Sequence, residues 1–398
     1  MKSLLDFLAH GLLHLGWLQI TAITLIATHI TIVCTTLYLH RSQTHRGVDF
    51  HPVVAHFFRL WLWLTTGMTT REWVAVHRKH HAHCEREGDP HSPRIFGAMR
   101  VFLRGADLYR EEVARKETLE RYGNGTPDDW IERHLYTPHS VLGIMIMLAI
   151  DVLAFGAIGL TVWAVQMAWI PFWAAGVVNG LGHFIGYRNF SSPDASTNLF
   201  PLGLVIGGEE LHNNHHAHAT SAKFSSKWYE FDIGWGYIRI LQALRLARVR
   251  RVAPRAAVRS LPRADVDIAM LQAVQTHRYA LMRRFGRVLK KTALRELRAL
   301  SRVADKASVS ARKSTLRKLL RLPEELLGAD ELRQLESAMQ GMRQLNAVVA
   351  MRRSLAGIWG SSLESSEQIL ARLQAWIEEA RSSSVVELTH FARHLSRL

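Results

Sequence analysis

Two short segments of the sequence concentrate histidine at the same spacing. HRKHH (residues 77–81) and HNNHH (residues 212–216) each place histidines at positions i, i+3 and i+4. Histidine accounts for 22 of 398 residues, so chance would supply roughly 0.07 such segments in a chain of this length. On a helix these three positions share one face. Because imidazole binds iron, zinc, copper and nickel, the repeated spacing predicts a metal site.

Two more segments contribute to the same constellation. HRSQTHR contains His40 and His45, and NGLGH places Asn179 and His183 at i and i+4. Residues five apart are about 140° apart on an α-helix, so His40 and His45 converge only if the helix ends between them. Eight or nine imidazoles are too many for one ion, so two metal ions are the simpler count. The nitrogen-rich set suits iron, and the count leaves zinc open. A solvated basic patch at a membrane surface is the alternative for a single cluster.

The four histidine-containing segments, called histidine boxes below, alternate with long apolar segments. Residues 12–39 contain no Lys, Arg, Asp or Glu, and as a helix they would be about 42 Å long, more than a hydrocarbon core of about 30 Å. Residues 140–187 contain one carboxylate, Asp151, and no Lys or Arg. This second segment is long enough for two crossings, with a turn expected within residues 154–161. The sequence therefore predicts an integral membrane protein.

The distribution of basic residues predicts the orientation. Residues 71–139 contain twelve Lys and Arg, whereas the turn near 156–161 has none, so the first segment and everything after about residue 188 should be cytoplasmic. Residues 51–70 are apolar enough for another span, but histidines flank them on both sides. If all these histidines serve one site, residues 51–70 must lie in the interface or re-enter the membrane.

The positive charge is confined to the C-terminal part. Residues 1–240 contain 20 basic and 20 acidic side chains, and residues 241–398 contain 30 and 14, so the whole formal charge of +16 lies in the latter. From about residue 260 the apolar spacing of three and four predicts amphipathic helices. We consider a solvated helical appendage near anionic lipid, a docking surface for an acidic electron donor or acyl carrier, and nucleic-acid binding. The third interpretation is the weakest, because no nucleic-acid-binding motif accompanies the charge.

Several carboxylates flank the histidine segments. A carboxylate that accepts a hydrogen bond from a ligand imidazole holds that ring in one tautomer. Ordinary solvated surface is the alternative for each of them. The candidates are Glu72, Asp89, Glu209, Glu210, Glu230 and Asp232.

Taken together, the motifs resemble those of the membrane fatty acyl desaturases, in particular the acyl-CoA (stearoyl-CoA type) branch. The resemblance covers roughly residues 15–250. It rests on HRSQTHR, EWVAVHRKHH followed by GDPHSP, NGLGHFIGYRNF, and GGEELHNNHH followed by KWYEFDIGW.

The resemblance implies a non-haem di-iron centre that uses O₂ and two electrons to insert a cis double bond, at the Δ9 position, into a saturated acyl chain. Asn179 matches a family position that holds a metal-bound water. The implied metal ligands are His40, His45, His77, His80, His81, His183, His212, His215 and His216.

The sequence departs from the family pattern near two of the boxes. Ser42, Gln43 and Thr44 stand where many acyl-CoA relatives carry an aromatic residue, and Ala75 and Val76 stand where animal relatives carry a charged pair. In those relatives the charged pair contacts the CoA head group. Both acyl-CoA and an acyl lipid therefore stay open as substrates.

The expected fold is an all-α integral membrane protein. Three to four transmembrane helices form a bundle, with a cytoplasmic histidine-rich helical cap and a C-terminal basic helical extension. The expected domains are residues 1–255, with the di-iron site, and residues 256–398. The alternatives are a fatty acyl hydroxylase or oxygenase of the same superfamily and, more remotely, a membrane metal transporter, whose pore would need polar groups within the spans.

The expected partners are membrane lipid and an external source of electrons. With Cys34 and Cys84 as its two cysteines, the sequence offers no iron–sulfur motif. We therefore expect a ferredoxin-like carrier with its reductase. We expect the protein in a bacterial inner membrane, with the histidine boxes and the C-terminus in the cytoplasm.

Overall fold

The computed structural model describes residues 2–263, 265–302, 304–360 and 364–398. Within these residues the chain is mostly helical, with four short strands, in agreement with the expected helical class. It divides into two compact units, and each is described by itself below. The first comprises residues 1–188 and 196–253, and the second comprises residues 189–195 and 254–398.

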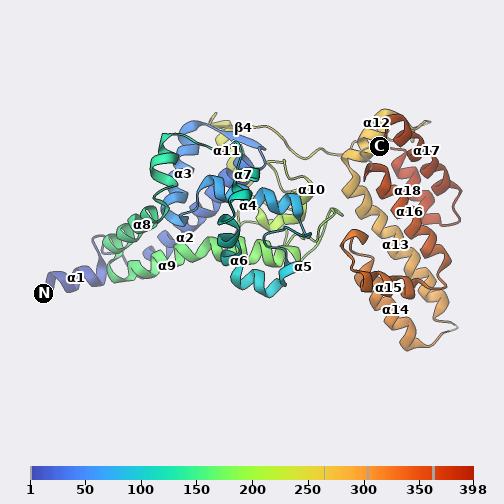
Figure 1. Cartoon of the computed structure of the whole chain (residues 1–398), viewed down its shortest axis with the longest axis horizontal. Coiled ribbons are helices and arrows are strands. Elements are labelled where there is room, and N and C mark those ends of the chain that lie inside the picture. Colours follow the sequence, from blue (N-terminus) through green and yellow to red (C-terminus); the bar gives the residue numbers. More distant parts are fainter. Residues whose placement is uncertain (1, 264, 303, 361–363) are drawn as a thin grey trace. The chain divides into compact units, whose positions relative to one another are not determined.

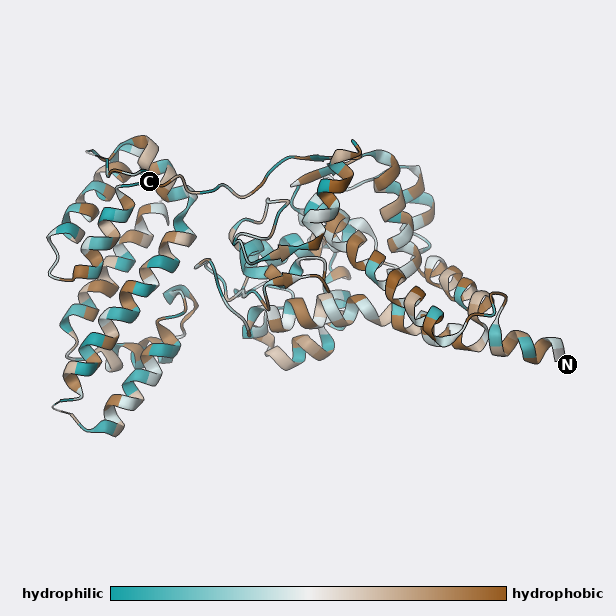
Figure 2. Cartoon of the chain, turned by 180° about the vertical axis from the view of Figure 1, so that it is seen from behind, coloured by the Kyte–Doolittle hydropathy of each residue, from teal (hydrophilic) through white to brown (hydrophobic). Residues whose placement is uncertain are grey.

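Three long apolar helices lie side by side in the first unit: α2 (Trp17–Cys34), α8 (Ser140–Phe155) and α9 (Gly159–Ile170) (Figure 1). Large apolar side chains project outward from them, with Leu18 85% exposed and Val141 66% exposed, and these helices are coloured largely as hydrophobic in Figure 2. Two stretches, Trp17–Thr44 and Ser140–His183, are long and apolar enough to cross a membrane. Helices that are apolar on their exposed faces fit lipid rather than water.

The stretch Ser140–His183 forms a helical hairpin, and its turn lies within residues 154–161, where it was expected. α8 ends at Gly156, whose φ of 71° favours glycine, and η3 (Gly156–Ile158) leads into α9. Trp163 Nε1 donates a hydrogen bond of 3.1 Å to the carbonyl oxygen of Ile144 across the resulting hairpin. α1 (Lys2–His10) contacts the turn.

The helix ends between His40 and His45, as expected, but its last part is a π-helix rather than an α-helix. The chain continues from α2 as a π-helix, η1 (Thr35–Thr44), and the N–H of His45 donates to the carbonyl oxygen of His40 at 3.1 Å. Hydrogen bonds from i to i+5 bring residues five apart onto one face. The widened helix therefore turns the two imidazoles toward the same side, which an α-helix would not do.

The segment between the first two histidine boxes leaves the site and returns to it. α3 (Pro52–Thr66) ends at Gly67, where φ is 63°, and α4 (Thr70–His83) begins after a capping box formed by Thr69 and Glu72. The ring centroids of His40 and His77 lie 4.5 Å apart, so a single crossing by the intervening chain is impossible.

The side chain of Arg59 on α3 points into the protein and not toward lipid head groups. Its side chain is 6% exposed, and its guanidinium donates to Asp129 at 2.5 Å and to Glu132 at 2.8 Å. This paired, buried cation ties α3 to the segment before α8.

The remaining elements of the first unit surround the histidine segments. Two pairs of short strands close loops there: β1 with β4 in antiparallel register and β2 with β3 in parallel register. The helices are α5 (Pro93–Phe96), α6 (Ala98–Val113), α7 (Lys116–Tyr122), η2 (Glu132–Tyr136), η4 (Pro171–Val178), η5 (Leu181–His183), η6 (Glu209–Leu211), α10 (His212–Ala217) and α11 (Ile233–Ala243), and the strands are β1 (Val48–Phe50), β2 (Leu202–Gly203), β3 (Phe231–Asp232) and β4 (Ala247–Val249).

The second unit is a helical bundle with a core of its own. Trp376, Phe285 and Phe391 are almost fully buried at its centre, and the rings of Phe285 and Phe391 are 5.0 Å apart. Ser365 caps α17 by accepting the N–H of Gln368. Because these helices share a buried core, they form a compact unit. The helices are α12 (Ile268–Thr276), α13 (Arg278–Leu300), α14 (Lys306–Leu319), η7 (Glu324–Leu326), α15 (Ala329–Met339), α16 (Arg343–Gly360), α17 (Ser366–Ser382) and α18 (Val386–Leu395).

The close approach of α3 and α8 leads to a test of the packing. A Cβ atom at Gly143 would lie 2.3 Å from the carbonyl oxygen of Trp63, whereas a Cβ at Gly236 on α11 would meet no atom within 4 Å. We expect Gly143→Ala to destabilise the protein by about 1–3 kcal/mol through overpacking. Gly236→Ala, the matched control, should stabilise it by about 0.5–1 kcal/mol. Thermal unfolding of both variants in detergent checks this, and equal midpoints would contradict the helix contact.

Candidate metal centre

The histidine segments meet at one place in the first unit. They come from η1, α4, η5 and α10, which are far apart in the sequence. Two groups of side chains each offer ligand atoms that all lie within 4.8 Å of one another. The first group is His40, His45, His77, His81 and His215, and the second is His80, Cys84, His183 and His216.

In the first group the Nε2 atoms point at one another. His215 Nε2 lies 3.0 Å from His40 Nε2 and 3.0 Å from His81 Nε2, and His81 Nε2 lies 3.1 Å from the Nε2 of His77. A neutral ring nitrogen carries either one proton or one lone pair, so His215 Nε2 cannot form good hydrogen bonds with both neighbours. Two nitrogens bound at a right angle about 2.1 Å from one ion would lie about 3.0 Å apart. The donor spacing fits a metal cation.

The orphaned nitrogens of the centre also fit a metal. Among the residues that the structure describes, the buried nitrogens His45 Nε2, His212 Nδ1 and His215 Nδ1 have no hydrogen-bond partner. His45 lies beside His81, with ring centroids 4.5 Å apart. A buried polar atom without a partner is costly in a folded protein, so His45 Nε2 is better explained as a ligand than as a structural group. The Nε2 atoms of His212 and His215 face other imidazoles, at 2.9 Å from His183 Nε2 and 3.0 Å from His40 Nε2, so their Nδ1 atoms are not the ligand atoms.

Three carboxylates fix the tautomers of ligand imidazoles. Glu209 accepts from His40 Nδ1 at 2.7 Å, Asp89 from His80 Nδ1 at 2.9 Å, and Glu85 from His183 Nδ1 at 2.8 Å. With the proton held on Nδ1, each ring presents the lone pair of Nε2 to the centre.

Glu85 is absent from the carboxylates that the sequence analysis selected. It is buried, and its backbone has a φ of 63°, which is uncommon for a residue with a side chain. The sequence alone does not single out Glu85, because Glu85, Glu87 and Asp89 stand at every second position between HRKHH and PHSP. Only the course of the chain separates the buried carboxylates from Glu87, which is exposed.

The other four carboxylate candidates make different contacts. Glu72 belongs to the capping box of α4, and Glu210 accepts the backbone N–H groups of Val205, Ile206 and Gly208. Glu230 accepts hydrogen bonds from Asn214, Tyr187 and nearby backbone. Asp232 forms a bidentate pair with Arg41, whose side chain is fully buried. This pair fastens η1 to the chain that follows α10.

Burial controls the protonation of the centre. It lowers the pKa of five imidazoles well below the ordinary value, and repulsion by neighbouring imidazoles lowers each further: His45, His77, His81, His212 and His215. Burial alone would raise the pKa of the Asp89 carboxyl, but the charge and hydrogen bond of His80 outweigh it and lower that pKa. Burial therefore favours the neutral form of these five imidazoles, which is the form that binds a metal.

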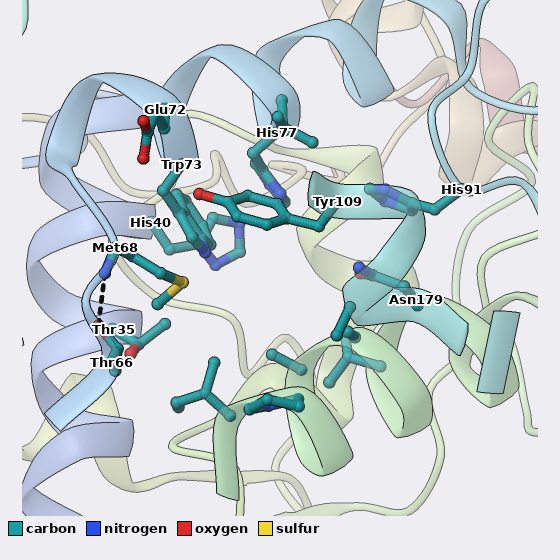
Figure 3. Close-up of a pocket in the computed structure, with 18 of the residues that line it drawn as sticks. Thr35, His40, Thr66, Met68, Glu72, Trp73, His77, His91, Tyr109 and Asn179 are labelled. Carbon is teal, nitrogen blue, oxygen red and sulfur yellow. Dashed lines mark hydrogen bonds between the residues drawn. The ribbon is translucent and has the colours of Figure 1, made fainter. Parts of the chain in front are cut away.

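A cavity of about 670 Å³ opens beside the histidines. His40, His77 and Asn179 line its upper part, with Tyr109 between them (Figure 3). Trp73, which also lines it, stacks on His77 with ring centroids 4.8 Å apart. The rest of the lining is mostly apolar and includes Ile144, Trp163, Met167, Ile170 and Val178. Trp228 is 95% exposed and takes no part in it.

The comparisons with known proteins point in one direction. The family model described as fatty acid desaturase matches residues 15–251. "Probable lipid desaturase ADS3.2, chloroplastic" from Arabidopsis thaliana is 30% identical over 54% of this chain and 59% of its own length. The "sn-1 stearoyl-lipid 9-desaturase" of Anabaena variabilis is 31% identical over 53% of this chain and 76% of its own. "Acyl-CoA 5-desaturase AL21" from Anemone leveillei is 30% identical over 54% and 65%.

Removal of a carboxylate that holds an imidazole should weaken metal binding. We expect Glu85→Ala to lower iron affinity about 10–100-fold, because the ring of His183 would lose its orientation. Glu87→Ala, two residues away and exposed, is the matched control and should bind iron like the wild type. Titration of the metal-free protein with ferrous iron measures both. Equal affinities would show that Glu85 does not position a ligand.

Proposed function

Since the chain belongs to the fatty acid desaturase family and is therefore an oxidoreductase of lipid metabolism, we propose that it inserts one cis double bond into a saturated fatty acyl chain. The observation that carries this proposal is the convergence of imidazole lone pairs at the wall of an apolar cavity. An unactivated methylene has no acidic proton, so acid–base groups cannot remove its hydrogen. An oxidising cofactor must act there, and the histidines are the groups that would hold it.

We assign the cofactor as two iron ions that use O₂ as co-substrate. Bound to these nitrogens, iron and O₂ would supply the oxidising power for removing hydrogen from a methylene. Asn179, in the cavity wall, would hold a metal-bound water. One ion would be held by His40, His45, His77, His81 and His215, and the other by His80, His183, His216 and the neighbouring His212.

The chain's own residues bind and orient the substrate. The cavity volume of about 670 Å³ falls within the range of about 300–1,000 Å³ typical of small-molecule sites. Its apolar lower wall would hold the methylene chain, and Trp73 would exclude water from the side of His77. We assign acyl-CoA as the substrate and Δ9 as the position of the double bond. An acyl lipid that undergoes the same reaction is the alternative substrate.

We propose that α2, α8 and α9 cross the bilayer and that α3 re-enters it. Arg59 is paired within the protein, so α3 needs no aqueous exit on the far side. The histidine centre and the basic C-terminal residues 256–398 then lie on the cytoplasmic face of a bacterial inner membrane. Residues 1–255 would carry the catalysis, and a ferredoxin-like carrier with its reductase would deliver the electrons.

Expression in a bacterium without a desaturase tests the reaction. Together with a ferredoxin and its reductase, the protein should produce a new monounsaturated acid, identified by gas chromatography–mass spectrometry of the lipids. The His212→Ala, His215→Ala, His216→Ala triple variant should produce none. A His134→Ala, His139→Ala double variant, altered at two exposed histidines, should retain the product. A hydroxylated acid in place of the alkene would assign the hydroxylase reaction.

The cavity predicts control of chain length. Met167 lines its apolar wall, whereas Met145 on α8 is 50% exposed. We expect Met167→Trp to shorten the preferred acyl chain, because the indole would fill part of the cavity. Met145→Trp should leave the preference unchanged. Product profiles from strains fed acids of graded length measure the shift, and identical profiles would place the acyl chain elsewhere.

A further inference from the structure

Cys84 lies inside the second group of ligand atoms. Its Sγ is 3.8 Å from His80 Nε2 and 3.9 Å from His216 Nδ1. Together with His183, the three residues offer four ligand atoms that all lie within 4.8 Å of one another. In the sequence, Cys84 stands beside the second histidine segment and could suggest a metal ligand, but as a single cysteine it is interpreted there as incidental.

The local backbone holds the thiol in this position. Cys84 stands four residues after His80 and is the C-cap residue that directly follows α4, so its side chain lies near the helix face that carries His80. The next residue, Glu85, is fixed at both ends: its N–H donates to Asp89 at 2.9 Å, and its carboxylate accepts from His183 and Ser92. The conformation at Glu85, with φ of 63°, is therefore kept by contacts that also orient His80 and His183.

Thus the groups that prepare two imidazoles for a metal also fix the thiol beside them. His80 and His183 have their Nδ1 atoms engaged by Asp89 and Glu85, which leaves both Nε2 lone pairs for the centre. With bonds of about 2.3 Å to sulfur and 2.05 Å to nitrogen, a five-coordinate ion separates S and N by about 3.1 Å at a right angle and about 3.8 Å at 120°. The observed separations of 3.8 and 3.9 Å are close to the wider value.

We propose that Cys84 is a metal ligand, so that one ion of the pair is bound by nitrogen and sulfur and the other by nitrogen alone. This inference rests on the proposed metal centre and adds a donor to it. Binding converts the thiol to a thiolate, and the proton leaves to solvent without a change in oxidation state. A thiolate is a softer and more electron-rich donor than imidazole. The two ions would consequently differ in their absorption spectra and in their preference for metals.

Cobalt(II) bound to the full-length, metal-free protein tests the proposal without reference to turnover. Thiolate bound to cobalt gives an intense near-ultraviolet charge-transfer band, and X-ray absorption detects sulfur at about 2.3 Å. We expect both signals in the wild type. Cys34→Ser is the matched control, because Cys34 is fully buried on α2 and away from the centre; it should keep both signals. Cys84→Ser should lose both while still binding metal.

A second measurement guards against a variant that fails to fold. In the Cys34→Ser protein, Cys84 is the sole thiol, and cobalt should slow its alkylation by N-ethylmaleimide at least tenfold. A wild-type spectrum without sulfur, or equal alkylation rates with and without cobalt, would overturn the proposal and leave Cys84 as a hydrogen-bonded neighbour. If the sulfur signal is present but no unsaturated acid is made in cells, the proposed function fails and the ligand assignment stands.

Discussion

The structure depends on one electrostatic constraint, which is that several neutral imidazoles turn their lone pairs toward the same buried volume. The contacts of 3.0 Å from His215 Nε2 to His40 and His81 cannot all be satisfied by protons. Burial and mutual repulsion also oppose the protonated rings. A bound cation would resolve the conflict, because each of these lone pairs could then be donated to it. The carboxylates of Glu209, Asp89 and Glu85 accept hydrogen bonds from the Nδ1 atoms of three of the imidazoles, which leaves the Nε2 lone pairs of those rings directed at the centre.

The surrounding fold can be understood as the means of meeting that constraint beside a membrane. The π-helix η1 turns His40 and His45 to one face, and the path through α3 and α4 brings His77 back to them. The buried pair of Arg41 and Asp232 fixes η1 against the chain that follows α10. The apolar cavity opens on the histidines from the side of the long apolar helices, so a substrate that is itself apolar can reach the centre.

Much of this could be predicted from residue types, but the details that depend on the course of the chain could not. The HxxHH segments, the turn near Gly156 and the helical C-terminal residues follow from periodicity and composition. The spacing of His40 and His45 indicates that the helix ends between them, but the π-helical geometry does not follow from it, because the sequence of η1 has no feature that distinguishes it from an α-helix. Glu85 is absent from the carboxylates selected from the sequence, and Cys84 is interpreted there as incidental, because the placement of both side chains depends on a left-handed backbone conformation at one residue. Amphipathic helices were expected after residue 260, yet no pattern indicated that they enclose a core of their own around Trp376.

We propose that these histidines hold a pair of iron ions, and the Mössbauer spectrum and iron content of the purified full-length protein test this directly. We expect two high-spin irons per chain, bound mainly by nitrogen and magnetically coupled when oxidised. Both irons should be absent from the His212→Ala, His215→Ala, His216→Ala protein. One iron per chain, or zinc retained in place of iron by a protein that produces unsaturated acid, would contradict the proposal.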